Sequence, residues 1–243
     1  MGAGGTGVRR SVRASKTGVI DAVKALDVDA VAAILGANPA LISATGHGDR
    51  SLLHLACGLR TTSARSRALQ VRLAALLLDR GLAIDAPYGR DKCTALFEAV
   101  ARARNVDLVR FLLERGADVR TAPGGGLFAA AWWQDVEILD VLLDAGADPE
   151  VVVGVTPFLA AWSWKRFDAA KHLVVRGADV NAQDRKGRTA LHIGLEKDFD
   201  PSLLEWLVRH GASADIADAD GVPARVKASR KRNPAFLAAL GRR

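Results

Sequence analysis

The amino-acid sequence predicts an all-α fold, a solenoid of about seven helix-turn-helix units joined by hairpin-like loops. The first observation is a residue that opens each unit at a regular interval, at Ser51, Thr94, Gly125, Thr156, Thr189 and Val222. The last four intervals are 31, 31, 33 and 33 residues (94 to 125, 125 to 156, 156 to 189 and 189 to 222), and the first is longer. A period of ~33 residues is typical of stacked helix pairs.

A second marker keeps the same register, a glycine after an apolar pair at Gly81, Gly116, Gly146, Gly177 and Gly211. These glycines predict the end of each second helix, because glycine adopts the left-handed conformation without steric cost. In the first unit we expect Asn38 to take this left-handed position. A threonine such as Thr156 predicts the start of a first helix, since its hydroxyl can accept a bond from a free backbone N–H, and Pro157 needs no donor there.

The residues around these markers identify a family. Thr94-Ala95-Leu96, Thr156-Pro157-Phe158 and Thr189-Ala190-Leu191-His192 match a T-P-L-H turn, and Gly116-Ala117-Asp118-Val119 and Gly177-Ala178-Asp179-Val180-Asn181 match a G-A-D-V-N ending. The chain resembles the ankyrin-repeat family over roughly residues 17–241. The resemblance implies that His54 and His192 bond the backbone of neighbouring loops, and that a partner protein binds a concave groove.

The predicted organisation is a flexible basic tail over residues 1–16 and a repeat domain over 17–243. The units are expected at about residues 17–47, 48–85, 86–120, 121–150, 151–183, 184–217 and 218–243, with the first and last acting as caps whose outer faces meet water. Residues 60–67 explain the long first interval in one of two ways, as a surface loop or as a backward extension of the second helix. The finger at residues 123–126 has lost the threonine cap, so we expect the fourth unit to be locally mobile.

Charge gathers at the two ends of the chain. Of the net charge of +7, residues 1–16 and 222–243 carry more than the total, so the rest of the chain is slightly acidic. The simpler interpretation is that these cations keep the capping ends soluble. The alternative function is a nucleic-acid or anionic-surface binder acting through them, although no aromatic residues are interleaved with the basic clusters as stacking platforms.

Other classes of function are not indicated. Cys57 and Cys93 lie in different units without metal-ligand spacing, so we expect free thiols in a reducing compartment. Because no run of ~18 apolar residues occurs, we expect no membrane span. We expect a cytoplasmic protein, with export as an effector left open. We also expect it to be monomeric. No histidine has triad-like spacing to a nucleophile, which favours a non-enzymatic protein without cofactor or metal.

The candidate site follows from the groove positions that the resemblance implies. The eighth residue after each opening position is Leu59, Arg102, Trp133, Trp164 or Lys197, and the seventh is Gly58, Ala101, Trp132, Ser163 or Glu196. Large apolar side chains exposed together are typical of an interaction site. We therefore predict that a partner protein contacts Trp132, Trp133, Val152, Val153, Val155 and Trp164, with Arg102, Arg188 and Lys197 as charged contacts.

The alternative for the three tryptophans is that they turn inward and fill gaps between helices. Trp162 and Trp206 are interpreted in that way, as packing residues. If Trp132, Trp133 and Trp164 face the groove, replacing all three with alanine is expected to abolish partner binding and to leave the helical content nearly unchanged.

Overall fold

Helices make up every regular element in the described part of the chain. The structure, a computed structural model, describes residues 14–121 and 126–241. Within these ranges the extended loops pair at isolated antiparallel bridges, Thr45 with Ser51, Tyr88 with Cys93 and Ala217 with Pro223. The chain divides into two compact parts, Met1–Ala117 and Asp118–Arg243. Most of the predicted basic tail and most of the finger at 123–126 lie outside the described residues.

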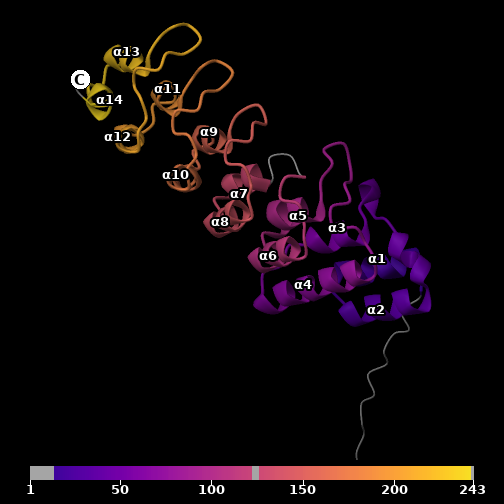
Figure 1. The fold of residues 1–243 in the computed structure, drawn as a ribbon. Coiled ribbons are helices and arrows are strands. Elements are labelled where there is room, and N and C mark those ends of the chain that lie inside the picture. The colour runs from indigo at the N-terminus through magenta and orange to yellow at the C-terminus, as the bar shows by residue number, and fades with distance from the viewer. Residues whose placement is uncertain (1–13, 122–125, 242–243) are drawn as a thin grey trace, which may run out of the picture. The chain divides into compact units, whose positions relative to one another are not determined.

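The first part contains three helix pairs. Its elements are α1 (Lys16–Lys24), α2 (Val28–Ala37), η1 (Pro39–Ser43), η2 (His47–Asp49), α3 (Leu52–Cys57), α4 (Ala64–Asp79), α5 (Ala95–Glu98), the π-helical η3 (Ala99–Ala103) and α6 (Val106–Glu114). The first helices α1, α3 and α5 pack side by side, and α2, α4 and α6 form a second layer (Figure 1). Fully buried leucines, among them Leu53, Leu73 and Leu108, form the core.

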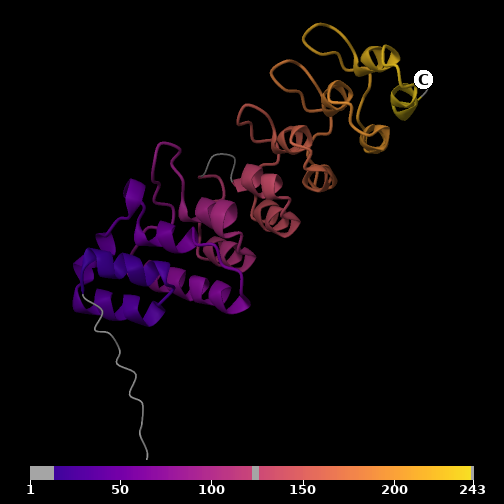
Figure 2. The same cartoon turned by 180° about the vertical axis from the view of Figure 1, so that it is seen from behind.

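The second part contains four helix pairs. Its elements are α7 (Leu127–Trp133), α8 (Val136–Asp144), α9 (Pro157–Ser163), α10 (Phe167–Val175), α11 (Ala190–Glu196), α12 (Pro201–Arg209), α13 (Ala224–Ser229) and α14 (Ala235–Ala239). The first helices of the pairs form one row, the second helices form another, and the loops project on the side of the first row (Figure 2). The seven pairs in the described ranges confirm the predicted all-α solenoid, whereas the exact unit boundaries stay predictions.

Side-chain caps start the first helices as predicted. The hydroxyls of Ser51, Thr94 and Thr156 each accept a bond from the backbone N–H three residues later, at 3.4, 3.3 and 3.4 Å. Such a cap satisfies a donor that the helix leaves free, and its loss costs ~1 kcal/mol. Gly125, which opens the fourth unit, lies outside the described residues, and α7 begins after Gly126, which is left-handed and gives no side-chain cap.

The glycine that ends each second helix is left-handed, as the sequence predicts. Gly81, Gly116, Gly146, Gly177 and Gly211 have φ between 87° and 97°. The expectation for Asn38 was wrong, because its φ is −143° and its ψ is 87°. Pro39 follows it directly and begins η1, and a residue that precedes proline is restricted to extended conformations.

The long first interval has both of the predicted causes, a surface loop and a backward extension of the second helix. Residues 59–62 form a loop, and Ser63 caps α4, whose 16 residues make it longer than the other second helices. Gln70, fully buried on α4, ties this loop down by donating to the carbonyl oxygens of Ala56 and Leu59 at 2.8 and 3.0 Å. The insertion is therefore part loop and part backward helix extension.

Trp162 lies in the core of the second part. It is fully buried, and its indole N–H donates to the carbonyl of Ala190 in the next unit at 2.9 Å. Its ring also packs against Phe167 and Phe199, with ring centroids 5.3 and 5.9 Å away. These contacts confirm the packing role predicted for Trp162 and fix α9 against α11. Trp206 is half-buried on α12 and stacks on His210.

Candidate functional site

An aromatic pair joins the ends of α7 and α9. Trp132 lies in the last turn of α7, and Trp164 is the residue that ends α9. Their ring centroids are 5.1 Å apart with an interplanar angle of 79°, which is the edge-to-face arrangement that aromatic quadrupoles favour. Trp132 is 42% exposed and Trp164 is 37% exposed. The two rings therefore hold neighbouring units together and still present surface to solvent.

Arg166 makes a second contact with the Trp132 ring. This arginine precedes α10, and its guanidinium carbon lies 4.8 Å from the centroid of the Trp132 ring. A cation over an indole face contributes ~0.5–1 kcal/mol at an exposed site. Trp132 thus contacts both the Trp164 ring and a guanidinium, and these two contacts favour one orientation of its ring. This role of Arg166 could not be predicted from the sequence, because it depends on residues of two units.

The remaining predicted apolar residues also reach the surface. Trp133 is 37% exposed, and Val152 and Val153 in the loop before α9 are 68% and 51% exposed. The Val153 N–H donates to the carbonyl of Val155 at 3.3 Å, which closes the tip of this loop. The three tryptophans are therefore partly packed and partly exposed, and binding of a partner by these residues stays a prediction.

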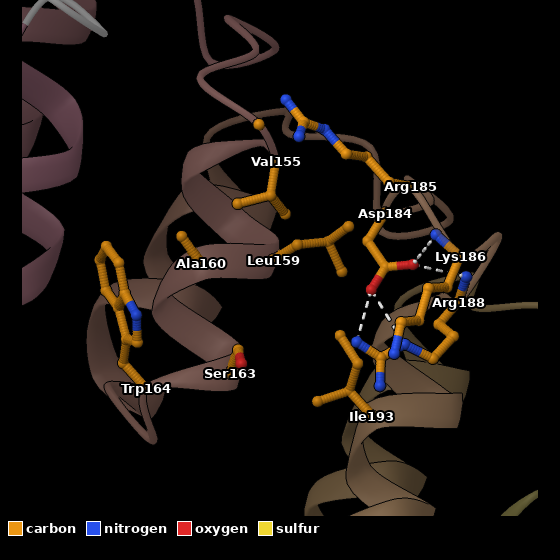
Figure 3. Close-up of a pocket in the computed structure, with 11 residues that line it drawn as sticks. Val155, Leu159, Ala160, Ser163, Trp164, Asp184, Arg185, Lys186, Arg188 and Ile193 are labelled. Atoms are coloured by element: carbon orange, nitrogen blue, oxygen red, sulfur yellow. Dashed lines mark hydrogen bonds and ion pairs between the residues drawn. The ribbon is translucent and has the colours of Figure 1, made fainter.

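A pocket lies between α9 and α11, beside Trp164. Its volume is about 290 Å³, close to the lower end of the range of ~300–1,000 Å³ found for ligand sites. Val155, Leu159 and Ile193 supply apolar walls, and Ser163 lies at the end of α9 (Figure 3). Three of the predicted residues, Val155, Trp164 and Arg188, line this pocket.

A carboxylate and an arginine organise the charged wall of the pocket. Asp184 accepts from Arg188 Nε and Nη2 at 2.9 and 2.7 Å, and also from the backbone N–H groups of Lys186 and Arg188 (Figure 3). Burial alone would raise the pKa of Asp184, but these bonds lower it below its usual range. The remaining guanidinium nitrogen of Arg188, Nη1, donates to Glu196 Oε2 at 2.6 Å. The Arg188 side chain therefore stabilises the loop before α11 through its pairs with Asp184 and Glu196.

The other cations near the pocket are Arg185, Lys186 and Lys197, and their environments differ from that of Arg188. Arg185 and Lys186 line it with exposed side chains, for which no ion pair occurs within the described residues. Lys197 Nζ donates to the carbonyl and hydroxyl oxygens of Ser163 at 2.7 and 3.0 Å, so this predicted residue caps the end of α9. Arg185, Lys186 and Leu159 were missed from the sequence, since only the packing of adjacent loops reveals them.

Arg102, the remaining predicted contact, belongs to a buried ionic cluster in the first part. Glu98 on α5 is fully buried, and its carboxylate pairs with Arg50 at 2.7 Å and with Arg102 at 3.0 Å. The Tyr88 hydroxyl donates to the same carboxylate. Hydrogen bonds to Glu98 and Tyr88 outweigh partial burial and raise the pKa of Arg50. Arg102 is thus engaged in stabilising Glu98, although its side chain remains 54% exposed.

The histidines of the T-P-L-H turn have the roles that the resemblance implied. The Nε2 atoms of His54 and His192 lie 2.8 and 3.0 Å from the carbonyl oxygens of Ala86 and Val222, each in the following unit. Burial is the main cause that lowers the pKa of His54. His172 pairs with Asp140 on the second-helix row at 2.8 Å. These three imidazoles each bond a structural group of the fold, and within the described residues they do not line a common pocket.

Both cysteines are free, as expected, with Cys57 buried and Cys93 half-buried. Residues 14–121 and 126–241 contain no group of three or more His, Cys, Asp or Glu side chains that could hold a metal. Nor does any described helix have the length and apolar character to cross a membrane.

Many cations of the C-terminal unit are paired. Lys227 contacts Asp218 at 2.6 Å and Glu196 at 3.1 Å, and Lys231 contacts Asp198 at 2.6 Å. Arg225 pairs with Asp215 at 3.0 Å. These pairs link α13 and its flanks to the preceding unit, so they give several of the basic residues a structural function.

Comparisons with known proteins agree with this architecture. A family model of three ankyrin repeats matches residues 127–220, and a model of a single ankyrin repeat matches residues 91–123. The ankyrin repeat domain of Bcl-3, a member of the IkappaB protein family, is similar at a TM-score of 0.76 with 22% identity, over 91% of this chain and 96% of that one. The human ASB11 ankyrin repeat domain has a TM-score of 0.69 and 23% identity, over 91% and 95%.

An ankyrin repeat domain from Acinetobacter baumannii AYE gives a TM-score of 0.63 with 25% identity, covering 77% of this chain and 95% of that one. Similarity at such identities reflects the fold, while the family models match the repeats themselves. Ankyrin repeats generally serve as protein interaction modules. The regular opening residues, the left-handed glycines, the bridging histidines and the matching family models together show that this chain belongs to the ankyrin-repeat family.

Proposed function

We propose that the chain binds a partner protein through an apolar patch on its second part, formed by Trp132, Trp133, Val152, Val153 and Trp164. The observation that carries this proposal is the exposure of three tryptophans, each by more than a third, at the ends of adjacent first helices. Tryptophan is among the residues most enriched in binding hot spots. Exposed apolar groups that lie together are uncommon on a monomer unless they meet another molecule.

The geometry also favours binding without a large entropic cost. Trp132 contacts both Trp164 and Arg166, so the ring loses less rotamer freedom than a free side chain when a partner covers it. Immobilising a free side chain costs about 0.5–1.5 kcal/mol at an interface. An anchor fixed in advance avoids much of that cost, which is the advantage of preorganisation.

A nucleic-acid or anionic-surface binder acting through the basic ends is the second candidate. It is supported less well, because Arg225, Lys227 and Lys231 are engaged in ion pairs with acidic residues. Each pair would have to be broken or shared before the cation could neutralise a phosphate. A strong dependence of binding on salt, lost when residues 1–16 and 225–243 are removed, would favour this candidate.

The test is affinity purification from the native cell with the full chain and single variants. Proteins captured by the wild type should be lost, or strongly reduced, with Trp132→Ala and with Trp164→Ala. Val175→Ala and Leu237→Ala are matched controls, because both side chains are exposed apolar groups outside the patch. They should leave capture unchanged. Equal loss in controls and patch variants, or capture that ignores both tryptophans, would refute the proposal.

A further inference from the structure

The pocket beside Trp164 combines two kinds of surface. One wall is apolar, with Val155, Leu159 and Ile193, and Trp164 lines the pocket at the end of α9. The other is the loop before α11, which contributes Asp184 and the cations Arg185, Lys186 and Arg188 (Figure 3). A volume of about 290 Å³ suits a partner side chain and its flanking backbone. The occupant must therefore supply an apolar group on one side and meet charge on the other.

The charge balance of the lining is positive. Three cations face one carboxylate among the lining residues, and Asp184 is already satisfied by Arg188 and by two backbone N–H groups. Arg185 and Lys186 are exposed beside the apolar wall, and the described residues offer them no carboxylate. An incoming carboxylate would complete this wall, whereas an incoming cation would meet like charge.

We propose that this pocket receives an acidic peptide segment of the partner, in which a bulky apolar side chain enters between Val155, Leu159 and Ile193 and a neighbouring Asp or Glu meets Arg185 and Lys186. The inference rests on the proposed function, since Trp164 belongs to both the patch and the pocket. Nucleic acid fits less well, because a phosphate backbone has no group for the apolar wall. Phosphate contacts alone give sequence-independent, salt-sensitive binding.

The experiment selects random dodecapeptides, displayed on phage, against the full-length protein. Selected peptides should carry Asp or Glu within a few residues of a bulky apolar residue. The most enriched peptide is then made with a fluorescein label and titrated by fluorescence polarisation. Versions with the carboxylates changed to amides, and with the apolar residue changed to serine, test the two halves of the pocket separately.

Charge reversal locates the site on the protein. The double variant R185E/K186E should weaken binding by about tenfold, because two attractive ion pairs at the surface become repulsive. The double variant R230E/R232E is a matched control, since it makes the same change in net charge at exposed arginines outside the pocket. It should change binding by less than about twofold. Circular dichroism checks that both variants keep the wild-type fold.

The outcomes separate this inference from the proposed function. Selection of basic or neutral peptides, selection of none, or equal weakening by the two charge reversals would overturn the acidic segment. So would competition by a short single-stranded oligonucleotide for the same site. If Trp132→Ala and Trp164→Ala abolish partner capture while R185E/K186E does not weaken peptide binding, the proposed apolar patch is supported and the proposed acidic segment is refuted. If the tryptophan variants change neither capture nor peptide binding, the proposed function falls.

Discussion

Replacing Trp132 and Trp164 with alanine, singly and together, measures how far these rings are part of the fold. Trp132 is 42% exposed and Trp164 is 37% exposed, so about three fifths of each ring is removed from water. For a side chain that buries ~200 Å² when covered, this is roughly 120 Å². At ~25 cal/mol per Å² the loss is about 3 kcal/mol, and about 2 kcal/mol once the compactness of the unfolded chain is included.

The two losses should not add. Edge-to-face contact between the rings, with centroids 5.1 Å apart, contributes ~0.5–1.5 kcal/mol beyond burial, and either single substitution removes it. With this contact included each single variant loses about 3 kcal/mol, and we expect the double variant to lose about 5 kcal/mol rather than ~6. Urea unfolding followed by circular dichroism gives the free energies of all four proteins. Additivity within ~0.3 kcal/mol, or single losses below ~0.5 kcal/mol, would refute the packing described.

The same calculation changes the design of the binding experiment. Replacing Trp132, Trp133 and Trp164 together would remove about 7 kcal/mol by the same reasoning, which is comparable with the total stability of many domains, ~5–15 kcal/mol. We therefore expect the triple variant to lose helical content, in place of the nearly unchanged content that the sequence suggested. Single variants keep the loss of an anchor separable from the loss of the fold.

Three further predictions concern stability. A Cβ at Gly58 would clash with the buried Glu98 carboxylate, so Gly58→Ala should cost about 3 kcal/mol by breaking an ionic cluster; unchanged urea unfolding would contradict this. The hydrogen bond from Lys227, together with those from the backbone N–H groups of Val222 and Asp220, lowers the pKa of Asp218 from 3.8 to about 2. The ionised Asp218 therefore contributes stability that is present above pH 3.8 and is lost as the pH falls towards 2. Lys227→Met should flatten the dependence of the unfolding temperature on pH in this range, and an equally steep dependence would refute the Lys227–Asp218 pair. Burial raises the pKa of the Cys57 thiol, so it should react with a disulfide reagent at the rate of unfolding; rapid reaction of the native protein would exclude its burial.

The features predicted correctly from the sequence are those set by local chemistry. A threonine hydroxyl that caps Thr156-Pro157, and a glycine such as Gly177 at φ 97°, act within a few residues of their own position. Each determines where one helix begins or ends. Because the units repeat, a local rule applied at each period also gives the fold. Tryptophan exposure could be predicted for the same reason, since Trp132 and Trp164 lie at fixed distances from an opening residue.

The features that the sequence did not reveal depend on pairs of distant residues. Arg50 and Glu98 are separated by 48 positions, and no periodic rule predicts a carboxylate buried between units. The left-handed residues between helices were missed because they are not glycine: Arg104, Gln134, Lys165 and Asp198 have φ between 50° and 60°. Their conformation follows from the packing of the two helices they connect, which overrides the preference of the side chain.

The position of Trp164 has a consequence for how binding would affect the fold. Its equivalent in the next unit, Lys197, reaches back to Ser163, just as Trp164 reaches back to Trp132. A side chain at this position therefore joins two units and remains accessible. In a linear array each unit is stabilised by its neighbours, so a partner that covers Trp164 would stabilise the contact between the units of α7 and α9 as well. Binding at one aromatic ring is in this way coupled to the order of two repeats.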